Sequence, residues 1–218
     1  MKYRSLCGFV FGLGVVLFWS ATSFAQTSSE AKALLKKVAS RKGALGFSAR
    51  FYQESPLKAI GIVETASGKV WFKKPGMVRW EYEAPEPMAY ISDGEILWIH
   101  SPEGNQVWRG DADAFFGESG GARFLSDVTT ITERFSMTLE GKEEGAVKAV
   151  LLPLKENDDL KEVTLFIDPA TFDIVKVRSV RVTGEETTLS FSAIRAEVPK
   201  ADFFEFTPPE GAVVTPLQ

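Results

Sequence analysis

The amino-acid sequence predicts a mainly β protein with a few helices, an α+β fold built on a single antiparallel sheet. About ten segments of the chain alternate apolar and polar side chains with a period of two, as half-buried strands do. Short turn sequences such as Lys74-Pro75-Gly76 and Asp93-Gly94 separate these segments. Helical periodicity is confined to the beginning of the chain and to one stretch near its middle.

The first 25 residues have the features of a secretory signal peptide. Lys2 and Arg4 give a positive start, an uncharged apolar run extends from Leu6 to Trp19, and Ser23-Phe24-Ala25 forms a small-x-small cleavage site. A membrane anchor is the alternative, but the run is shorter than the roughly 20 residues that span a bilayer. We therefore predict export to the periplasm and cleavage after Ala25.

The predicted mature chain, residues 26–218, is a single acidic domain without cysteine. The only cysteine of the sequence, Cys7, lies within the apolar run. Loss of Lys2 and Arg4 changes the formal charge from −4 to −6. A domain of this size can be stable through its apolar core without disulfides, and an acidic exported domain is a poor candidate for binding nucleic acid.

An amphipathic helix is predicted at the start of the mature chain. Thr27-Ser-Ser-Glu30 has the pattern of a capping box, and Gly43 is a typical residue for the helix end. Four apolar residues follow the capping box at helical spacing: Ala31, Leu34, Leu35 and Val38. A helix at a membrane surface is possible, but a helix packed on a sheet is favoured.

The stretch from Gly68 to Pro102 contains three aromatic-rich strands and three of the five tryptophans. Val78, Trp80 and Tyr82 form a wholly apolar face, and charged residues occupy the other face of that strand. The apolar run from Ile96 to Ile99 predicts a strand that is covered on both sides.

The middle of the chain, residues 111–133, interrupts the strand pattern with short helical segments and glycines. An insertion of this size in a β protein is usually a functional lid or a loosely ordered loop. Strands then resume at Phe135 and continue in hairpin order to the end of the chain, where Phe203-Phe-Glu-Phe206 is followed by Thr-Pro-Pro209.

The sequence offers little catalytic chemistry. His100 is the only histidine, so no second histidine or cysteine can complete a metal site or a cysteine nucleophile pair. No Gly-x-Ser-x-Gly element supports a serine hydrolase, and the glycines from Gly117 to Gly121 lack the Lys-Ser/Thr of a phosphate-binding loop. We therefore predict a protein that is not an enzyme and that holds neither a metal nor a cofactor.

The aromatic content favours binding of an apolar ligand. Phenylalanine occurs 17 times, and many copies lie on strand faces. A well-packed core is the alternative explanation. However, a helix and a short lid can cover only one face of a sheet, and a curved sheet under a small lid would enclose an apolar cavity.

Several motifs resemble those of the LolA family of periplasmic lipoprotein carriers. They are Gly68-Lys-Val-Trp-Phe-Lys-Lys-Pro-x-x-Val-Arg-Trp-Glu-Tyr82, Ser92-Asp-Gly-x-x-Leu-Trp-Ile-x-x-Pro102, Gln106, Leu152-Pro-Leu-Lys155 and Phe204-x-Phe-Thr-Pro-Pro-x-Gly211. The resemblance covers essentially the whole predicted mature chain.

The resemblance implies an unclosed antiparallel β-barrel, with an N-terminal helix and a short helical lid over an apolar interior that holds acyl chains. It also implies the partners: triacylated lipoproteins, an inner-membrane ABC lipoprotein exporter and an outer-membrane lipoprotein acceptor. Because no other subunit is implied, we expect a monomer.

Residue roles follow from the same resemblance. We predict that the acyl-chain cavity is lined by Phe51, Val78, Trp80, Tyr82, Trp98 and Phe191. We predict that the lid is formed by Phe115, Phe116, Phe124 and Leu125. The family holds its lid shut through an arginine just before the proline that ends the second strand, and here that position is Lys74. A lysine can still donate to carbonyl groups but lacks the planar fork of arginine.

Two other functions remain open at the level of the sequence. A lipid- or apolar-peptide-binding sensor of the same fold would usually carry a second domain. A purely structural exported β domain would have a filled interior. An outer-membrane acceptor of similar fold would have a lipid-modified cysteine at its cleavage site, where this chain has Ala25-Gln26.

Overall fold

A computed structural model describes residues 22–41, 45–112, 131–155, 159–197 and 199–217. The helices are α1 (Thr22–Ala39), α4 (Ile131–Arg134) and the 3₁₀-helix η2 (Ala201–Phe204). The strands are β1 (Gly46–Leu57), β2 (Ile62–Lys73), β3 (Met77–Ala84), β4 (Met88–Ser92), β5 (Ile96–Ser101), β6 (Gln106–Asp111), β7 (Phe135–Glu143), β8 (Ala146–Pro153), β9 (Leu160–Ile167), β10 (Ile174–Arg181), β11 (Glu186–Ala196) and β12 (Val213–Pro216).

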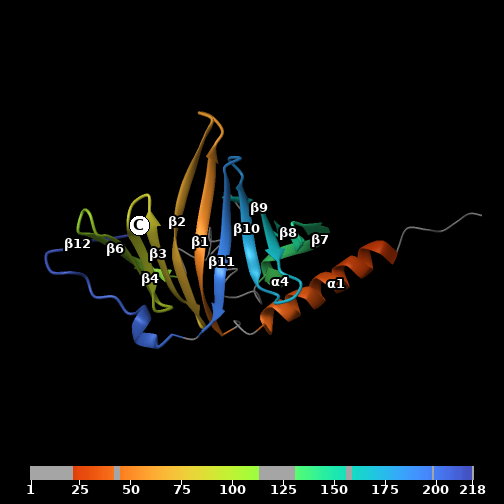
Figure 1. The fold of residues 1–218 in the computed structure, drawn as a ribbon, viewed down its shortest axis with the longest axis horizontal. Coiled ribbons are helices and arrows are strands. Elements are labelled where there is room, and N and C mark those ends of the chain that lie inside the picture. The colour runs from red at the N-terminus through yellow and green to blue at the C-terminus, as the bar shows by residue number, and fades with distance from the viewer. Residues whose placement is uncertain (1–21, 42–44, 113–130, 156–158, 198, 218) are drawn as a thin grey trace, which may run out of the picture.

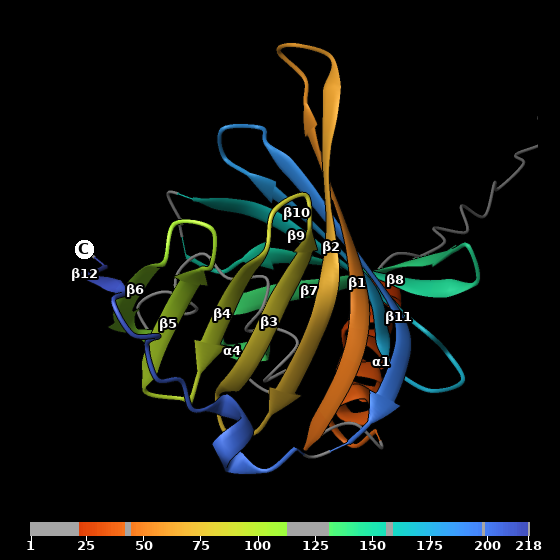
Figure 2. The same ribbon diagram turned by 60° about the vertical axis from the view of Figure 1, so that its left-hand side comes forward.

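All twelve of these strands belong to one sheet, in the order β12-β6-β5-β4-β3-β2-β1-β11-β10-β9-β8-β7. Every neighbouring pair is antiparallel except β12 and β6, which are parallel. Within the described chain the two outermost strands, β12 and β7, do not pair with each other, so the sheet curls without closing (Figures 1 and 2). The predicted fold, a single curled sheet that forms an unclosed barrel with an N-terminal helix, is confirmed.

Helix α1 packs against the inner, concave face of the sheet beside β7 (Figure 1). Ala31, Leu35 and Val38 are buried, whereas the neighbouring lysines are exposed. The predicted one-sided helix is therefore present, but it begins at Thr22 rather than at the capping box that starts with Thr27. The five residues before Thr27 contain neither glycine nor proline, so nothing in them interrupts an α-helix.

The main hydrophobic core lies on the inner face. It combines the buried side chains of α1 with those of β1, β2, β3 and the strands from β11 to β7. Leu97 and Ile99 of β5 form a second buried cluster with Ala112. The inner face therefore provides a continuous apolar surface.

The C-terminal segment covers part of the outer face, which the sequence did not predict. Phe203 contacts Trp71 of β2 with ring centroids 5.2 Å apart, and Phe206 contacts Trp98 of β5 at 5.8 Å. The chain then adds β12 beside β6. This segment therefore covers β5 on its outer side, so the strand is covered on both sides as its apolar run predicted.

Candidate functional site

Five of the six residues predicted to line the cavity lie together on the inner face of the sheet. Phe51 of β1 is directly opposite Phe191 of β11. On its other side it faces Gly68 of β2, which in turn faces Tyr82 of β3. Trp80 and Val78 share the inner face with Tyr82, because alternate residues of a strand point to the same side.

The aromatic rings of this group are in direct contact. The centroid of Phe51 lies 4.9 Å from Trp80 and 4.9 Å from Tyr82, and Trp80 lies 6.3 Å from Phe191. These separations are typical of favourable tilted and edge-to-face pairs. We call Phe51, Trp80, Tyr82 and Phe191 the aromatic cluster.

Gly68 makes room for the aromatic cluster. A Cβ atom at this position would lie 2.9 Å from Cε1 of Phe51 and 1.9 Å from the carbonyl oxygen of Glu81. The strand pairing between β2 and β3 shifts register at the same point. A glycine is therefore required where β1, β2 and β3 carry their largest rings side by side.

Tyr82 is the polar end of the cluster. Its hydroxyl donates a hydrogen bond of 3.0 Å to Oε1 of Gln53. Burial raises the pKa of Tyr82 to about 12, with a smaller contribution from nearby Tyr90. Burial also raises the pKa of Tyr90. Both hydroxyl groups therefore stay neutral across the physiological range.

Trp80 carries a buried donor without an acceptor among the described residues. Its side chain is buried, and its indole Nε1 makes no hydrogen bond to them. A buried unsatisfied N–H group is energetically unfavourable. Trp80 is therefore held by its packing among apolar side chains and not by a hydrogen bond to a described residue.

Sequence reasoning missed several members of the same surface. Phe47 and Phe72 pair on the inner face at 4.9 Å, and Phe72 lies 6.1 Å from Trp80. Tyr90 of β4 is directly opposite Trp80. The period-two alternation of β1 and β2 could have identified Phe47 and Phe72, because Phe47 shares its parity with Phe51 and Phe72 is opposite Phe47.

Trp98 does not share this surface, and the prediction that it lines the same cavity is wrong. Trp98 is opposite Ile91, and Ile91 is opposite Arg79, so Trp98 lies on the outer face with Arg79. There it contacts Phe206 and the guanidinium of Arg109. An apolar run without alternation does not reveal which of its residues face inward.

The predicted lid residues Phe115, Phe116, Phe124 and Leu125 lie outside the described residues, so their role stays a prediction. Lys74, the predicted clasp, lies at the turn between β2 and β3, and its backbone N–H donates to the carbonyl oxygen of Leu45 at 3.0 Å. Its proposed contact with the lid also stays a prediction.

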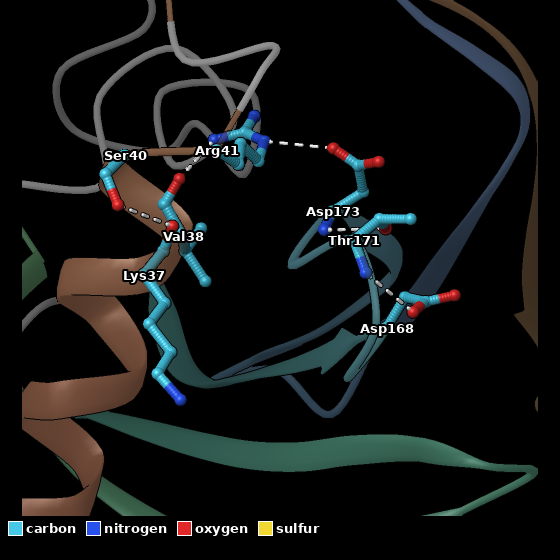
Figure 3. A network of polar contacts seen from close by, with 7 residues as sticks. All are labelled: Lys37, Val38, Ser40, Arg41, Asp168, Thr171 and Asp173. Carbon is cyan, nitrogen blue, oxygen red and sulfur yellow. Dashed lines mark hydrogen bonds and ion pairs between the residues drawn. The ribbon is translucent and has the colours of Figure 1, made fainter.

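A partly buried ion pair links the end of α1 to the turn between β9 and β10 (Figure 3). Nε of Arg41 lies 3.2 Å from Oδ1 of Asp173, and Nη1 donates to the carbonyl oxygen of Val38 at 2.9 Å. The side chain of Arg41 is only 5% exposed, and burial lowers its pKa although Asp173 opposes this shift. The guanidinium also lies over the ring of Phe47 at 5.4 Å.

The turn between β9 and β10 presents Asp173 to this arginine. Oδ1 of Asp168 accepts hydrogen bonds from the backbone N–H groups of Ala170 and Thr171, and Thr171 Oγ1 accepts one from Asp173 (Figure 3). Helix α1 ends at Ala39, two residues before Arg41, so helical spacing in the sequence does not predict this contact.

A hollow of about 340 Å³ lies on the outer face, away from the aromatic cluster. Ser48, Trp71 and Arg195 are among its lining residues, and the strand pairing places Ser48 between the other two. It therefore does not correspond to the predicted acyl-chain cavity.

Among the described residues, no group of histidine, cysteine and acidic side chains could hold a metal ion. None of the helices described is long and apolar enough to cross a membrane.

Comparison with known sequences identifies the family. The sequence profile of the family described as "Outer membrane lipoprotein carrier protein LolA" matches residues 42–207. The chain belongs to the LolA family. An outer-membrane lipoprotein carrier protein from Dechloromonas aromatica is 32% identical over 152 residues, which cover 69% of this chain and 72% of the relative. One from Yersinia pestis is 26% identical over 203 residues, covering 89% and 91% of the two chains.

Two solved structures share the fold of this chain. A conserved protein from Thermus thermophilus superposes with a TM-score of 0.59 at 14% sequence identity, covering 86% of this chain and 99% of its own. MucB superposes with a TM-score of 0.51 at 16% identity, covering 83% of this chain and 64% of its own. At these identities the likeness concerns the fold alone.

Proposed function

We propose that this LolA-family protein binds the acyl chains of lipoproteins against its aromatic inner face and carries them through the periplasm to the outer membrane. The observation that carries the proposal is the grouping of Phe51, Val78, Trp80, Tyr82 and Phe191 on one inner face. The described part of this face is broad and apolar, as a carrier of acyl chains requires.

The energetics of an acyl chain explain why a cover is needed. Each buried methylene contributes about 0.8 kcal/mol, so a 16-carbon chain exposed to water is unfavourable by on the order of 12 kcal/mol. A lipoprotein with several such chains cannot leave a bilayer for water without a protein that replaces the lipid. Several aromatic rings on a curved sheet supply apolar area of the required kind.

The transport cycle that we propose has three partners. An inner-membrane ABC exporter supplies the triacylated lipoprotein, the present protein binds it as a monomer, and an outer-membrane acceptor receives it. In this cycle the lid residues Phe115, Phe116, Phe124 and Leu125 cover the bound chains, and Lys74 helps to hold the lid closed.

Release of a lipoprotein from membranes tests the proposal. Processed protein beginning at Gln26 is added to inner-membrane vesicles that contain the exporter, ATP and a labelled lipoprotein. We expect a soluble one-to-one complex that forms only with ATP. Absence of a soluble complex with every lipoprotein tested would overturn the carrier function.

A pair of tyrosine variants links the result to the inner face. Tyr82→Glu places a carboxylate in the aromatic cluster, whereas Tyr52→Glu places one on the exposed side of β1. We expect release to fall strongly for Tyr82→Glu and to remain normal for Tyr52→Glu. Equal release by the two variants would exclude the aromatic cluster as the acyl-chain site.

A further inference from the structure

The hairpin of β1 and β2 extends beyond the rest of the sheet. Pairing of β1 with β11 ends at Glu54, and pairing of β2 with β3 begins at Ser67. Between these limits the two strands pair only with each other, up to the pair of Leu57 and Ile62. Figures 1 and 2 show this hairpin rising well above the neighbouring strands.

The end of this hairpin carries apolar side chains that are exposed to water. Ile60 is 66% exposed, Ile62 50% and Val63 53%. At these exposures the three side chains are not part of a hydrophobic core. They also cannot stabilise the ribbon much, because an isolated two-stranded hairpin is only marginally stable. Contiguous exposed apolar groups on a monomer usually mark an interaction site.

The apolar character extends to both faces of the ribbon. Ile62 and Val63 are consecutive in β2 and therefore point to opposite faces. Their cross-strand partners, Leu57 and Pro56, are also apolar. A protein partner contacts one face of such a ribbon, whereas a lipid layer surrounds it on all sides.

Polar residues follow immediately behind the apolar end. Ser55 is opposite Glu64 and Glu54 is opposite Thr65. Both glutamates are exposed. These two glutamates limit insertion to the apolar end. Lys58 lies within that end, in the turn after Leu57, and its charge is paired with Glu186 of β11 at 2.8 Å, so the end has no free positive charge.

We propose that the end of the β1–β2 hairpin, residues 56–63, inserts into the interfacial region of a phospholipid bilayer and positions the protein at the membrane. The inference rests on the proposed function, because a carrier of acylated proteins must meet a membrane at each end of its path. Binding comes from apolar area and not from attraction of basic residues to anionic lipid. It therefore does not increase with the fraction of anionic lipid.

The test compares two triple variants of the processed protein by flotation with phosphatidylethanolamine–phosphatidylcholine vesicles. The hairpin variant is Ile60→Ser, Ile62→Ser and Val63→Ser. The control variant changes three comparably exposed apolar residues elsewhere: Leu152→Ser, Val213→Ser and Val214→Ser. We expect the hairpin variant to lose vesicle binding by about tenfold or more through its lost apolar area, and the control variant to bind as the unchanged protein does.

A fluorescent label reports insertion directly. The chain from Gln26 contains no cysteine, so Ile60→Cys gives a single site for an environment-sensitive dye. Its emission should shift to the blue with vesicles, and a label at Val213→Cys should not respond. Vesicles enriched in phosphatidylglycerol should give no larger shift.

Failure of this inference differs from failure of the carrier function. If the unchanged protein does not bind vesicles, or if the hairpin variant binds equally well, membrane insertion is excluded. If the hairpin binds only a protein partner, the unchanged protein will not bind vesicles. Soluble lipoprotein complexes would still form in that case, whereas failure of the carrier function would abolish them.

Discussion

Gly68 is the residue on which the inner face depends most directly. Its missing side chain provides the space in which Phe51 contacts both Trp80 and Tyr82. The same glycine lies at a shift of register between β2 and β3. A larger residue must therefore displace both the backbone carbonyl of Glu81 and the packed ring of Phe51.

Gly68→Ala should lower the free energy of unfolding by about 2–3 kcal/mol, as overpacking of a filled interior does. Urea denaturation followed by tryptophan fluorescence measures the change. Gly104→Ala is the matched control, because its new methyl group would meet only the exposed side chain of Gln106. Equal stability of both variants would show that the inner face can relax around Gly68.

The buried indole of Trp80 leads to a second prediction. Trp80→Phe keeps an aromatic ring and removes the unsatisfied N–H group, so stability should change by less than about 1.5 kcal/mol. Trp80→Ala removes the ring and should lower stability by about 3–5 kcal/mol. Thermal and urea unfolding distinguish the two variants. A larger loss in Trp80→Phe would contradict the prediction, and would mean that the vacated volume stays open as a cavity or that the indole N–H has an acceptor.

Tyr82 should make stability fall at alkaline pH. Its pKa is about 12 in the folded protein against 10.0 ordinarily. Below pH 10 the hydroxyl is protonated in both states, so its contribution is complete. Above pH 10 the unfolded chain releases the proton first, and the free energy of unfolding falls by on the order of 2–3 kcal/mol as the pH reaches 12.

The measurement is the difference between the unchanged protein and Tyr82→Phe in urea denaturation from about pH 9 to about pH 12, the interval that spans both pKa values. The phenylalanine variant should lose less stability over this interval, because Tyr90 and the other titrating groups are present in both proteins. Parallel curves would contradict a raised pKa at Tyr82.

At the scale of elements, helix α1 is held by the apolar side of its last turns and by the ion pair of Arg41 with Asp173. The helix covers the inner face beside β7, so this part of the face is shielded from solvent while the helix is attached. The buried arginine and the turn between β9 and β10 make this attachment specific.

Arg41→Ala should lower stability by about 2 kcal/mol, because it removes the ion pair with Asp173, the hydrogen bond to the Val38 carbonyl and the packing of the buried guanidinium over Phe47. Hydrogen exchange should accelerate in α1 more than in the strands. The control is Arg50→Ala, which removes an exposed ion pair with Glu83 and should change stability by less than about 1 kcal/mol. Unchanged exchange in α1 would exclude Arg41 as its anchor.

At the scale of the whole molecule, most of the fold was predicted from the spacing of apolar residues along the chain. Alternation identified β3 and its inner residues Val78, Trp80 and Tyr82, because one face of that strand is apolar and the other is charged. The spacing from Ala31 to Val38 identified helix α1, whereas the capping box at Thr27 does not mark its start. The curling of the sheet into an unclosed barrel was predicted from the resemblance to LolA carriers, because no local sequence pattern encodes it.

The remaining features depend on contacts between distant segments. Trp98 was placed on the wrong face because β5 is covered on both sides, so its sequence does not alternate. The C-terminal segment supplies that outer cover through Phe206. The parallel pairing of β12 with β6 joins residues far apart in the sequence, and local propensity does not predict such pairing.

The central claim is that the inner face holds acyl chains, and site-specific photocrosslinking tests it most directly. A photoreactive phenylalanine derivative is placed at Tyr82 on the inner face or at Tyr52 on the outer face, and each protein is loaded with a lipoprotein that carries isotopically labelled acyl chains. We predict crosslinks to labelled acyl chains from position 82 and none from position 52. Acyl-chain crosslinks from position 52 with none from position 82 would contradict the account.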